Sequence, residues 1–449
     1  MMRASIRPRL LDAATLLAAT ALLCSAAIYN RYPIVWPDTG TYLHIVNVGF
    51  RSVFYSLFVF PAIVTRTLWT VVIAQSMLMA CLLRLVTREV FGIASRIRFV
   101  GLIGALCIVS SLPWYTGFLM ADIFAPMMVL GLFLMVFCAD HLTPCQNGFV
   151  RIVTLVAALV HFSHLPVAIA LIGTALVARF ILRGRIPNPI PHLALPSAIV
   201  GVALAAMFAA NYLTLGIFTY SVGGYAFFLG RLISDGPGAA YLRESCGTIP
   251  YKLCAYVDHL PTDEDTFIWS RKSPFRKVGG FNGERDEGMA IIIGTIESYP
   301  LWTLQTIISN TFEQLTQGGI GFADFPSHTK PSRNIANYYP ADFVAYLNSR
   351  QNHSELFIVP ALSILHMAIV AAGSLYCCML AIVWVRKRHW LALKFLFTVS
   401  LGILLNAFVT GALSEPIARY QSRMTWLIPL VALASTNLLR PWRLFKTDV

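Results

Sequence analysis

Residues 123–139 read IFAPMMVLGLFLMVFCA, an apolar stretch without a charged side chain. Comparable stretches recur along the chain, and a helix needs about 20 mostly apolar residues to cross a bilayer. Of the 449 residues, 57% are hydrophobic and 12% are charged, about half the charged share of a typical soluble domain. This composition excludes a soluble enzyme, a disordered protein and a secreted disulfide scaffold, and it predicts a polytopic membrane protein.

Eight apolar segments are predicted to cross the membrane as helices. A further apolar run, 150–182, is interrupted by HFSHLP at 161–166, where Pro166 cannot continue the helical hydrogen-bond ladder. We expect two shorter helices that meet at Pro166, or one re-entrant pair. The predicted fold is therefore an all-α polytopic membrane protein with about eight spans plus a broken or re-entrant helix pair. The eight segments are 10–29, 67–87, 99–118, 123–139, 193–214, 356–385, 390–412 and 424–438.

Lysine and arginine residues indicate the orientation, because cytoplasmic loops are enriched in both. If 150–182 begins and ends on one side, 18 basic residues share that side, which we assign as cytoplasmic. The topology then explains the net charge of +13, and no nucleic-acid partner is needed. The 18 residues are Arg3, Arg7, Arg9, Arg84, Arg88, Arg96, Arg98, Arg151, Arg179, Arg183, Arg185, Arg386, Lys387, Arg388, Lys394, Arg440, Arg443 and Lys446.

The other, external side holds two short loops and a hydrophilic insert, residues 220–350, with 11 basic and 13 acidic residues. The length of the insert suits a small soluble domain. We predict an N-terminal transmembrane module with catalytic external loops over 1–219, the external domain over 220–350, and a C-terminal transmembrane module over 351–449. The N-terminus resembles a signal peptide, but its apolar run is long for one and predicts a retained anchor.

Two features of the insert have alternative interpretations. Cys246 and Cys254 lie in a compartment that permits a disulfide, so they form either that disulfide or two buried thiols. The acidic string TDED, 262–265, is expected to be a solvated turn, with calcium binding as the alternative.

The loop after the first span contains RYPIVWPDTGTYLH, residues 31–44, in which Asp38 lies among prolines and aromatic side chains. Ionisable groups near membrane depth are costly, so Asp38 is a candidate catalytic residue. The alternative is structural, because Pro-Asp-Thr-Gly is good turn chemistry and Asp38 could cap the next helix. Candidate pocket or binding residues that follow it are Tyr42, His44, Arg51 and Tyr55.

A second acid, Asp122, stands at the external end of the fourth apolar segment, where it is a catalytic candidate or a helix cap. His161 and His164 mark the break in 150–182. Two histidines provide too few ligands for a metal site, so they line a cavity or are hydrogen-bonded groups at a helix break.

The last external loop contains Arg419 and Arg423, which are four residues apart and so share one helix face. One interpretation is that they bind a specific phosphate, whose geometry a guanidinium matches. The other is that their side chains extend toward lipid phosphates. The predicted topology brings both arginines, both acids and the histidine break to the external membrane face. Two carboxylates and a guanidinium pair at one face suit transfer from a lipid-linked phosphate donor.

The chain resembles the glycosyltransferase C superfamily, polytopic enzymes that take a sugar from a polyprenyl-phosphate or polyprenyl-pyrophosphate carrier. The resemblance covers most of the chain and rests on WPDTGTYL with Asp38, on RSVFYSLF at 51–58, and on Asp122 between spans three and four. The bacterial aminoarabinose and protein-mannosyl transferases are similar to it. The chain differs in its soluble domain, which is inserted between spans rather than C-terminal, so the subfamily and acceptor stay open.

The resemblance implies a membrane glycosyltransferase, in a bacterial inner membrane with its active site on the periplasmic side. Asp38 would be the general base and Arg51, Arg419 and Arg423 would bind the donor phosphate. Asp122 would position the acceptor or help to hold a divalent cation, which is optional. The implied partners are a polyprenyl-phosphate-linked sugar, the lipid bilayer, and a glycolipid, polysaccharide or protein acceptor. A transporter or flippase, or a non-catalytic envelope-assembly protein, is the competing class; we find none of the related halves that transporters often show.

Overall fold

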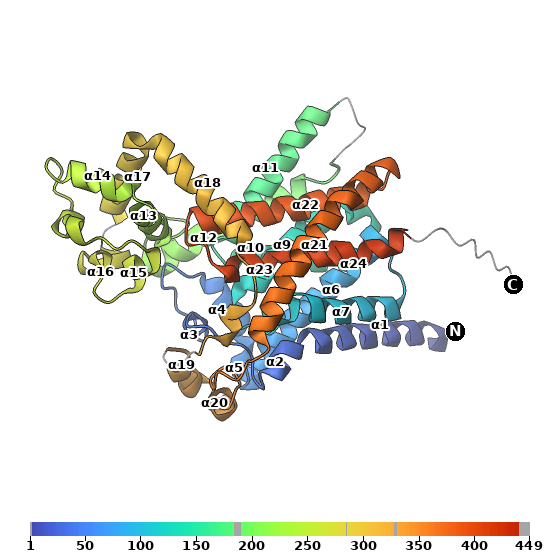
Figure 1. The fold of residues 1–449 in the computed structure, drawn as a ribbon. Helices are drawn as coiled ribbons and strands as arrows, with labels where there is room; N and C mark the ends of the chain where they lie inside the picture. The colour runs from blue at the N-terminus through green and yellow to red at the C-terminus, as the bar shows by residue number, and fades with distance from the viewer. Residues whose placement is uncertain (1, 184–189, 284, 327–329, 440–449) are drawn as a thin grey trace.

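The computed structural model describes residues 2–183, 190–283, 285–326 and 330–439 (Figure 1). Within these ranges the regular structure is helical, and one isolated bridge pairs Ile34 with Phe118. The predicted all-α fold is confirmed. Arg185, Arg440, Arg443 and Lys446, which belong to the predicted basic set, lie outside the described residues.

The helices follow one another with short connections. The first half of the chain forms α1 (Met2–Leu23), α2 (Ser25–Tyr29), α3 (Thr39–Tyr42), α4 (Val53–Val59), α5 (Pro61–Thr65), α6 (Trp69–Phe91), α7 (Arg96–Val109), α8 (Leu112–Thr116), α9 (Phe124–Phe137), α10 (Pro144–Leu159), α11 (His164–Leu182) and α12 (Ala194–Leu215). The second half forms α13 (Gly224–Ser234), α14 (Pro237–Ser245), α15 (Glu264–Trp269), α16 (Pro274–Lys277), α17 (Arg285–Ser298), α18 (Pro300–Thr316), α19 (Lys330–Tyr338), α20 (Pro340–Leu347), α21 (Val359–Arg386), α22 (Trp390–Ala407), α23 (Ala418–Thr425) and α24 (Leu427–Leu439). Short 3-10 turns occupy Ala121–Ile123, Ala139–His141, Lys252–His259, Gly280–Asn282 and Gly321–Asp324, and a π-helical turn, Phe408–Ala412, extends α22.

Five helices of the described chain are long and apolar enough to cross a membrane: α6, α11, α12, α21, and α22 with its π-helical turn. They indicate an integral membrane protein. The predicted count of about eight spans is not confirmed, because the apolar helical parts of the other predicted segments are shorter, for example Leu10–Leu23 within α1. Segment 10–29 is divided at Cys24, 99–118 at Ser110 and 424–438 at Trp426, whereas 123–139 forms the 14-residue α9.

Helix α9 lies at the centre of the molecule. Its residues from Phe124 to Val136 are all buried, and it packs most extensively against α10. A side chain at Gly131 would collide with Thr154 of α10, so glycine permits the close approach of these two helices. Because protein surrounds α9, its sequence is apolar on every side without having to face lipid.

The predicted interruption of 150–182 is present, and it separates α10 from α11. The break occupies residues 160–163, and Pro166 lies in the first turn of α11, where its missing N–H costs no intrahelical hydrogen bond. The break therefore precedes the proline instead of falling on it.

The basic segment at the start of α7 meets α1 and α24 at the end of the bundle where α1 begins and α24 ends (Figure 1). Arg96 pairs with Asp12 of α1 at 2.7 Å, and Arg98 donates to the Asn437 side chain of α24 at 3.2 Å. Helices α13–α17 lie at the opposite end (Figure 1).

The first part of the predicted insert has a hydrophobic core of its own, formed by buried residues between Tyr225 and Ile292. A disulfide joins Cys246 to Cys254, as the sequence permitted. Further along the insert, Phe322, Tyr339 and Tyr346 belong instead to the core of the helical bundle.

The TDED string starts α15 and is not a solvated turn throughout. The Asp263 side chain accepts a hydrogen bond from the Thr266 N–H at 2.7 Å, and Glu264 is buried. Burial raises the pKa of Glu264 well above its usual range, although the charge of Arg231 opposes this shift.

We expect Glu264→Gln to stabilise the protein at about pH 8 and to change little near pH 4. A carboxyl whose pKa is raised on folding binds its proton more tightly in the folded state, so the free energy of unfolding falls as pH rises from about 4.5 through the folded-state pKa. Glutamine keeps the neutral form and removes that loss. The measurement is the unfolding midpoint of purified protein across this pH range.

Glu297→Gln, an exposed site on α17, is the matched control and should leave the pH profile unchanged. Glu415, Asp235 and Asp265 also act on Glu264, and the pKa of Glu415 is raised by its own burial, so the variant should flatten the profile without abolishing its slope. A profile identical to that of the wild type would show that Glu264 is ionised in the folded protein.

Candidate functional site

Asp38 occupies the residue before α3, yet its side chain does not cap that helix. Its Oδ1 instead accepts a hydrogen bond from Nη2 of Arg51, which lies in the segment leading into α4. The Asp38 Oδ2 atom is 3.6 Å from Nη1 of Arg419 on α23. The carboxylate therefore joins two segments that are far apart in sequence, a role that the cap interpretation did not include.

Asp122 lies in the 3-10 turn that leads into α9, and its side chain makes no cap hydrogen bond there. Its Oδ1 is 3.4 Å from Nη1 of Arg423 and 3.9 Å from Nε of Arg419. Arg419 and Arg423 share one face of α23, as their spacing predicted, and this face meets the acid at the start of the central helix.

These contacts form one chain of alternating charges, Arg51–Asp38–Arg419–Asp122–Arg423, which we call the charged cluster. Three guanidiniums and two carboxylates give it a formal charge of about +1. Burying charges is costly unless they are paired, and the alternation satisfies that requirement for both carboxylates. The surplus positive charge favours an anionic ligand.

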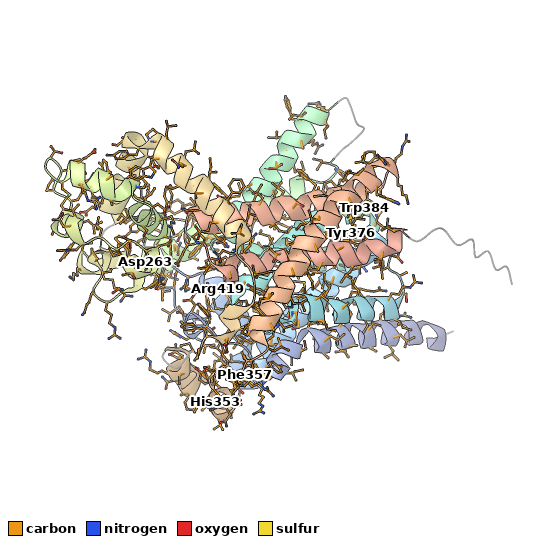
Figure 2. All side chains as sticks on the ribbon, in the orientation of Figure 1. Asp263, His353, Phe357, Tyr376, Trp384 and Arg419 are labelled. Atoms are coloured by element: carbon orange, nitrogen blue, oxygen red, sulfur yellow. A yellow bond between two sulfur atoms is a disulfide. The ribbon has the colours of Figure 1, made fainter. Side chains whose placement is uncertain are left out.

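The cluster extends from the protein surface into the interior. The side chains of Asp38 and Arg51 are 19% and 13% exposed, whereas those of Arg419, Asp122 and Arg423 are 4%, 1% and 0% exposed. Arg419 lies at the end of the bundle that faces α13–α17 (Figure 2). A ligand that arrives from solvent would therefore meet Asp38 and Arg51 first.

Besides Asp122, partners on two further segments hold Arg423. Its Nε and Nη2 donate to Asn406 Oδ1 of α22 at 3.1 and 2.7 Å, and Nη2 also donates to Ser163 Oγ at 2.9 Å. Ser163 Oγ lies 2.8 Å from Nδ1 of His161, and the rings of His161 and His164 are 5.1 Å apart. The histidine break is thus connected to the cluster through Ser163.

Aromatic rings surround the arginines. The Arg419 guanidinium lies over the rings of Trp36 and Tyr420, with 5.1 and 4.7 Å to their centroids. Such cation–π contacts stabilise a charge without neutralising it.

The other sequence-predicted aromatic residues pack against further rings. Tyr42 packs edge-on against Tyr55 at 4.9 Å and lies within electrostatic range of Arg51, Asp38, Asp122 and Arg419. His44 stacks on Tyr338 of α19 at 5.3 Å.

Some hydrogen-bonding capacity of the cluster is unused within the described chain. Asp122 Oδ2 accepts no hydrogen bond there, and Arg419 Nε and Nη1 donate none, because their carboxylate neighbours lie at 3.6 Å or beyond. Buried polar atoms normally have partners, so these atoms are places where a ligand or water can bind. Among the described residues no three His, Cys, Asp or Glu side chains gather as ligands for a metal ion.

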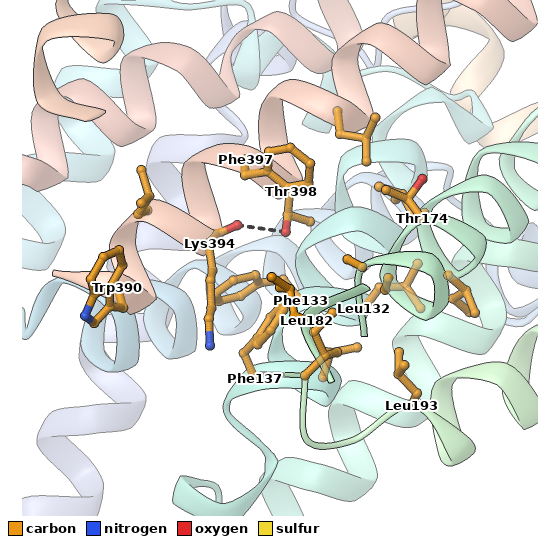
Figure 3. A pocket seen from close by; sticks show the side chains of 18 residues that line it. Leu132, Phe133, Phe137, Thr174, Leu182, Leu193, Trp390, Lys394, Phe397 and Thr398 are labelled. Carbon is orange, nitrogen blue, oxygen red and sulfur yellow. Dashed lines mark hydrogen bonds between the residues drawn. The ribbon is translucent and has the colours of Figure 1, made fainter. Parts of the chain in front are cut away.

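A large apolar cavity of about 910 Å³ lies among α9, α11 and α22 (Figure 3). Its lining includes Phe133 and Phe137 of α9, Leu171 of α11, and Lys394 and Leu401 of α22. The same three helices reach the charged cluster, because Asp122 precedes α9, Ser163 precedes α11 and Asn406 is near the end of α22. The distance from Leu401 to Asn406 along α22 is about 8 Å, at about 1.5 Å per residue.

Asn406, Ser163 and Trp36 complete the site, and the sequence analysis did not single them out as functional. The sequence could have indicated Asn406, because an amide in the apolar stretch GILLNAFV must have a hydrogen-bond partner at that depth. Ser163 and Trp36 stand inside strings that were already noted, HFSH and VWPD, but nothing in those strings indicates which side chain meets an arginine.

Comparison of the chain with family models, curated proteins and solved structures finds no match in any of the three. The described residues are all-helical, with five helices that indicate an integral membrane protein and a largely buried, net-positive charged cluster at one end of the bundle.

Proposed function

We propose that this protein is a membrane glycosyltransferase that moves a sugar from a polyprenyl-phosphate donor to an acceptor at the external face of the membrane. The observation that supports it is the charged cluster, which combines partly exposed and buried arginines with two carboxylates. Guanidiniums bind phosphate through several hydrogen bonds, and a carboxylate can accept a proton from an acceptor hydroxyl.

The apolar cavity among α9, α11 and α22 supports a lipid-linked donor. On α22 its lining ends at Leu401, about 8 Å along the helix from Asn406, which binds Arg423, so an isoprenoid chain could lie between these helices while its phosphate meets the arginines. A soluble sugar nucleotide would have no use for an apolar cavity of this size.

In the proposed reaction, Asp38 takes the proton from an acceptor hydroxyl as that oxygen attacks the anomeric carbon of the sugar. The bond from that carbon to the phosphate oxygen breaks, and its electron pair leaves with the polyprenyl phosphate. Arg51 and Arg419 neutralise the negative charge that develops on the phosphate. Asp122 fixes the positions of Arg419 and Arg423, and Arg423 in turn anchors the cluster to α22 and the histidine break.

Binding of the carrier tests the proposal without knowledge of the sugar. In lipid nanodiscs, a polyprenyl phosphate should bind more tightly than the matching polyprenol, and Arg51→Gln should weaken phosphate binding by roughly 10- to 100-fold, the effect of one lost charged hydrogen bond. Arg179→Gln, an exposed site on α11, is the control and should bind like the wild type. Equal affinity for the phosphate and the alcohol would reject a lipid-phosphate donor.

A further inference from the structure

A second cavity of about 300 Å³ lies apart from the charged cluster, among α21, the loop after α18, the corner between α7 and α8, and α23. Its floor includes Ser422 and Trp426, its wall includes His366 of α21, and Met367 lies at its more exposed side. Ser422 is next to Arg423 on α23 and Trp426 directly follows that helix, but none of the five cluster residues is among the described residues that line the cavity.

Two buried polar groups in this lining, Nδ1 of His366 and the indole N–H of Trp426, have no hydrogen-bond partner within the described chain. A third group, the hydroxyl of Ser422, interacts with the hydroxyl of Tyr115. All three residues are more than nine-tenths buried. Buried polar groups normally have partners, so unsatisfied groups in one cavity indicate a place where a ligand can bind.

The three groups also specify the chemistry of the occupant. Nε2 of His366 lies 3.3 Å from the Ile108 carbonyl, to which it can only donate, so Nδ1 is left as an acceptor. The Trp426 N–H can only donate, and the Ser422 hydroxyl can do either. None of the described residues that line the cavity is Asp, Glu, Lys or Arg. This set matches a neutral ligand that carries several hydroxyl groups.

The side of the cavity formed by α21 leads onto an apolar surface. Ile364, Met367 and Leu375 on α21 are exposed, and this helix is a membrane-span candidate with few of its residues buried inside the protein. An alkyl chain attached to the ligand would find lipid-like surroundings there.

We propose that this cavity binds the neutral, hydroxylated head group of a glycolipid-like amphiphile, with the alkyl chain of that molecule along α21. The inference does not depend on the proposed transferase activity, because none of its residues belongs to the charged cluster. A free sugar has the same chemistry as this head group, and a probe with or without an alkyl chain distinguishes a free sugar from an amphiphile.

The test is equilibrium binding of octyl β-glucoside, below its micellar concentration, to the protein in phosphatidylcholine nanodiscs, with methyl β-glucoside as the chainless probe. We expect saturable binding of octyl β-glucoside and at least about tenfold weaker binding of methyl β-glucoside. Ser422→Ala and Trp426→Phe should each lower the affinity by about fivefold, the effect of one net hydrogen bond of about 1 kcal/mol.

The buried variants could lose binding because they misfold, so a variant at the exposed side of the cavity serves as a second test. Met367→Trp places a larger side chain beside the opening and should abolish saturable binding. Ser400→Ala, an exposed site on α22, should bind like the wild type. If the uptake of octyl β-glucoside is not saturable and is equal in Met367→Trp and the wild type, the proposal is overturned. The cavity would then hold water. Equal affinities for the two glucosides would overturn the placement of the chain along α21.

Discussion

Asp38→Asn is expected to lower the rate of sugar transfer by about 10²- to 10⁴-fold, the usual contribution of a general base. A carboxamide has nearly the shape of the carboxylate, but it cannot take the proton from an acceptor hydroxyl. The side chain is partly exposed, so the protein should still fold and insert into the membrane. The measurement is mass spectrometry of envelope lipids and glycans from cells that carry no gene, the wild-type gene or the variant.

The matched control is Asp12→Asn, which removes a carboxylate that also pairs with an arginine, at the opposite end of the bundle. This variant should keep wild-type transfer. A modified lipid or glycan that appears with the wild-type gene and is equally abundant with Asp38→Asn would assign the base to another residue. The absence of any gene-dependent product, together with tight binding of polyprenyl phosphate, would favour a transporter of that lipid.

Hydropathy predicts membrane residence well but gives a less certain count of spans. The stretch 123–139 is as apolar as a lipid-facing helix, yet α9 is short and is covered on all sides by protein. Burial in protein and burial in lipid select the same side chains, so their composition cannot distinguish the two. Likewise, Ser110 ends α7 with an extended backbone inside an otherwise apolar run, a change of direction that depends on packing against α23 through Ser111.

The site could be predicted from the sequence only as a set of candidates. Asp122 and Arg423 are charged residues in apolar surroundings, where a charge raises the free energy of the folded protein, so both can be recognised as candidates from the sequence. Which acid meets which arginine depends on contacts between residues about 300 positions apart, for example Asp122 with Arg423. The order of the charges, and the place of Asn406 between Arg423 and the Tyr420 carbonyl, follow from packing that no local pattern contains.

Arg423→Ala should destabilise the protein strongly, by about 3–5 kcal/mol, the cost of breaking a buried ion pair by removing one partner. Arg423 is fully buried, and its loss leaves Asp122 with only Arg419, at 3.9 Å, and leaves Asn406 Oδ1 without its donor. The measurement is the unfolding midpoint in detergent. Arg98→Ala, an exposed site whose guanidinium also donates to an asparagine, is the control and should change stability by less than about 0.5 kcal/mol.

A double variant separates the structural role of Arg423 from a role in phosphate binding. Asp122→Asn combined with Arg423→Met removes both charges and keeps similar volumes, so it should recover much of the stability that Arg423→Ala loses. If Arg423→Ala keeps the wild-type unfolding midpoint and loses only affinity for polyprenyl phosphate, then Arg423 contacts the phosphate directly, as the sequence suggested. If stability falls and the double variant restores it, Arg423 is the internal anchor of the cluster, and the phosphate meets Arg51 and Arg419.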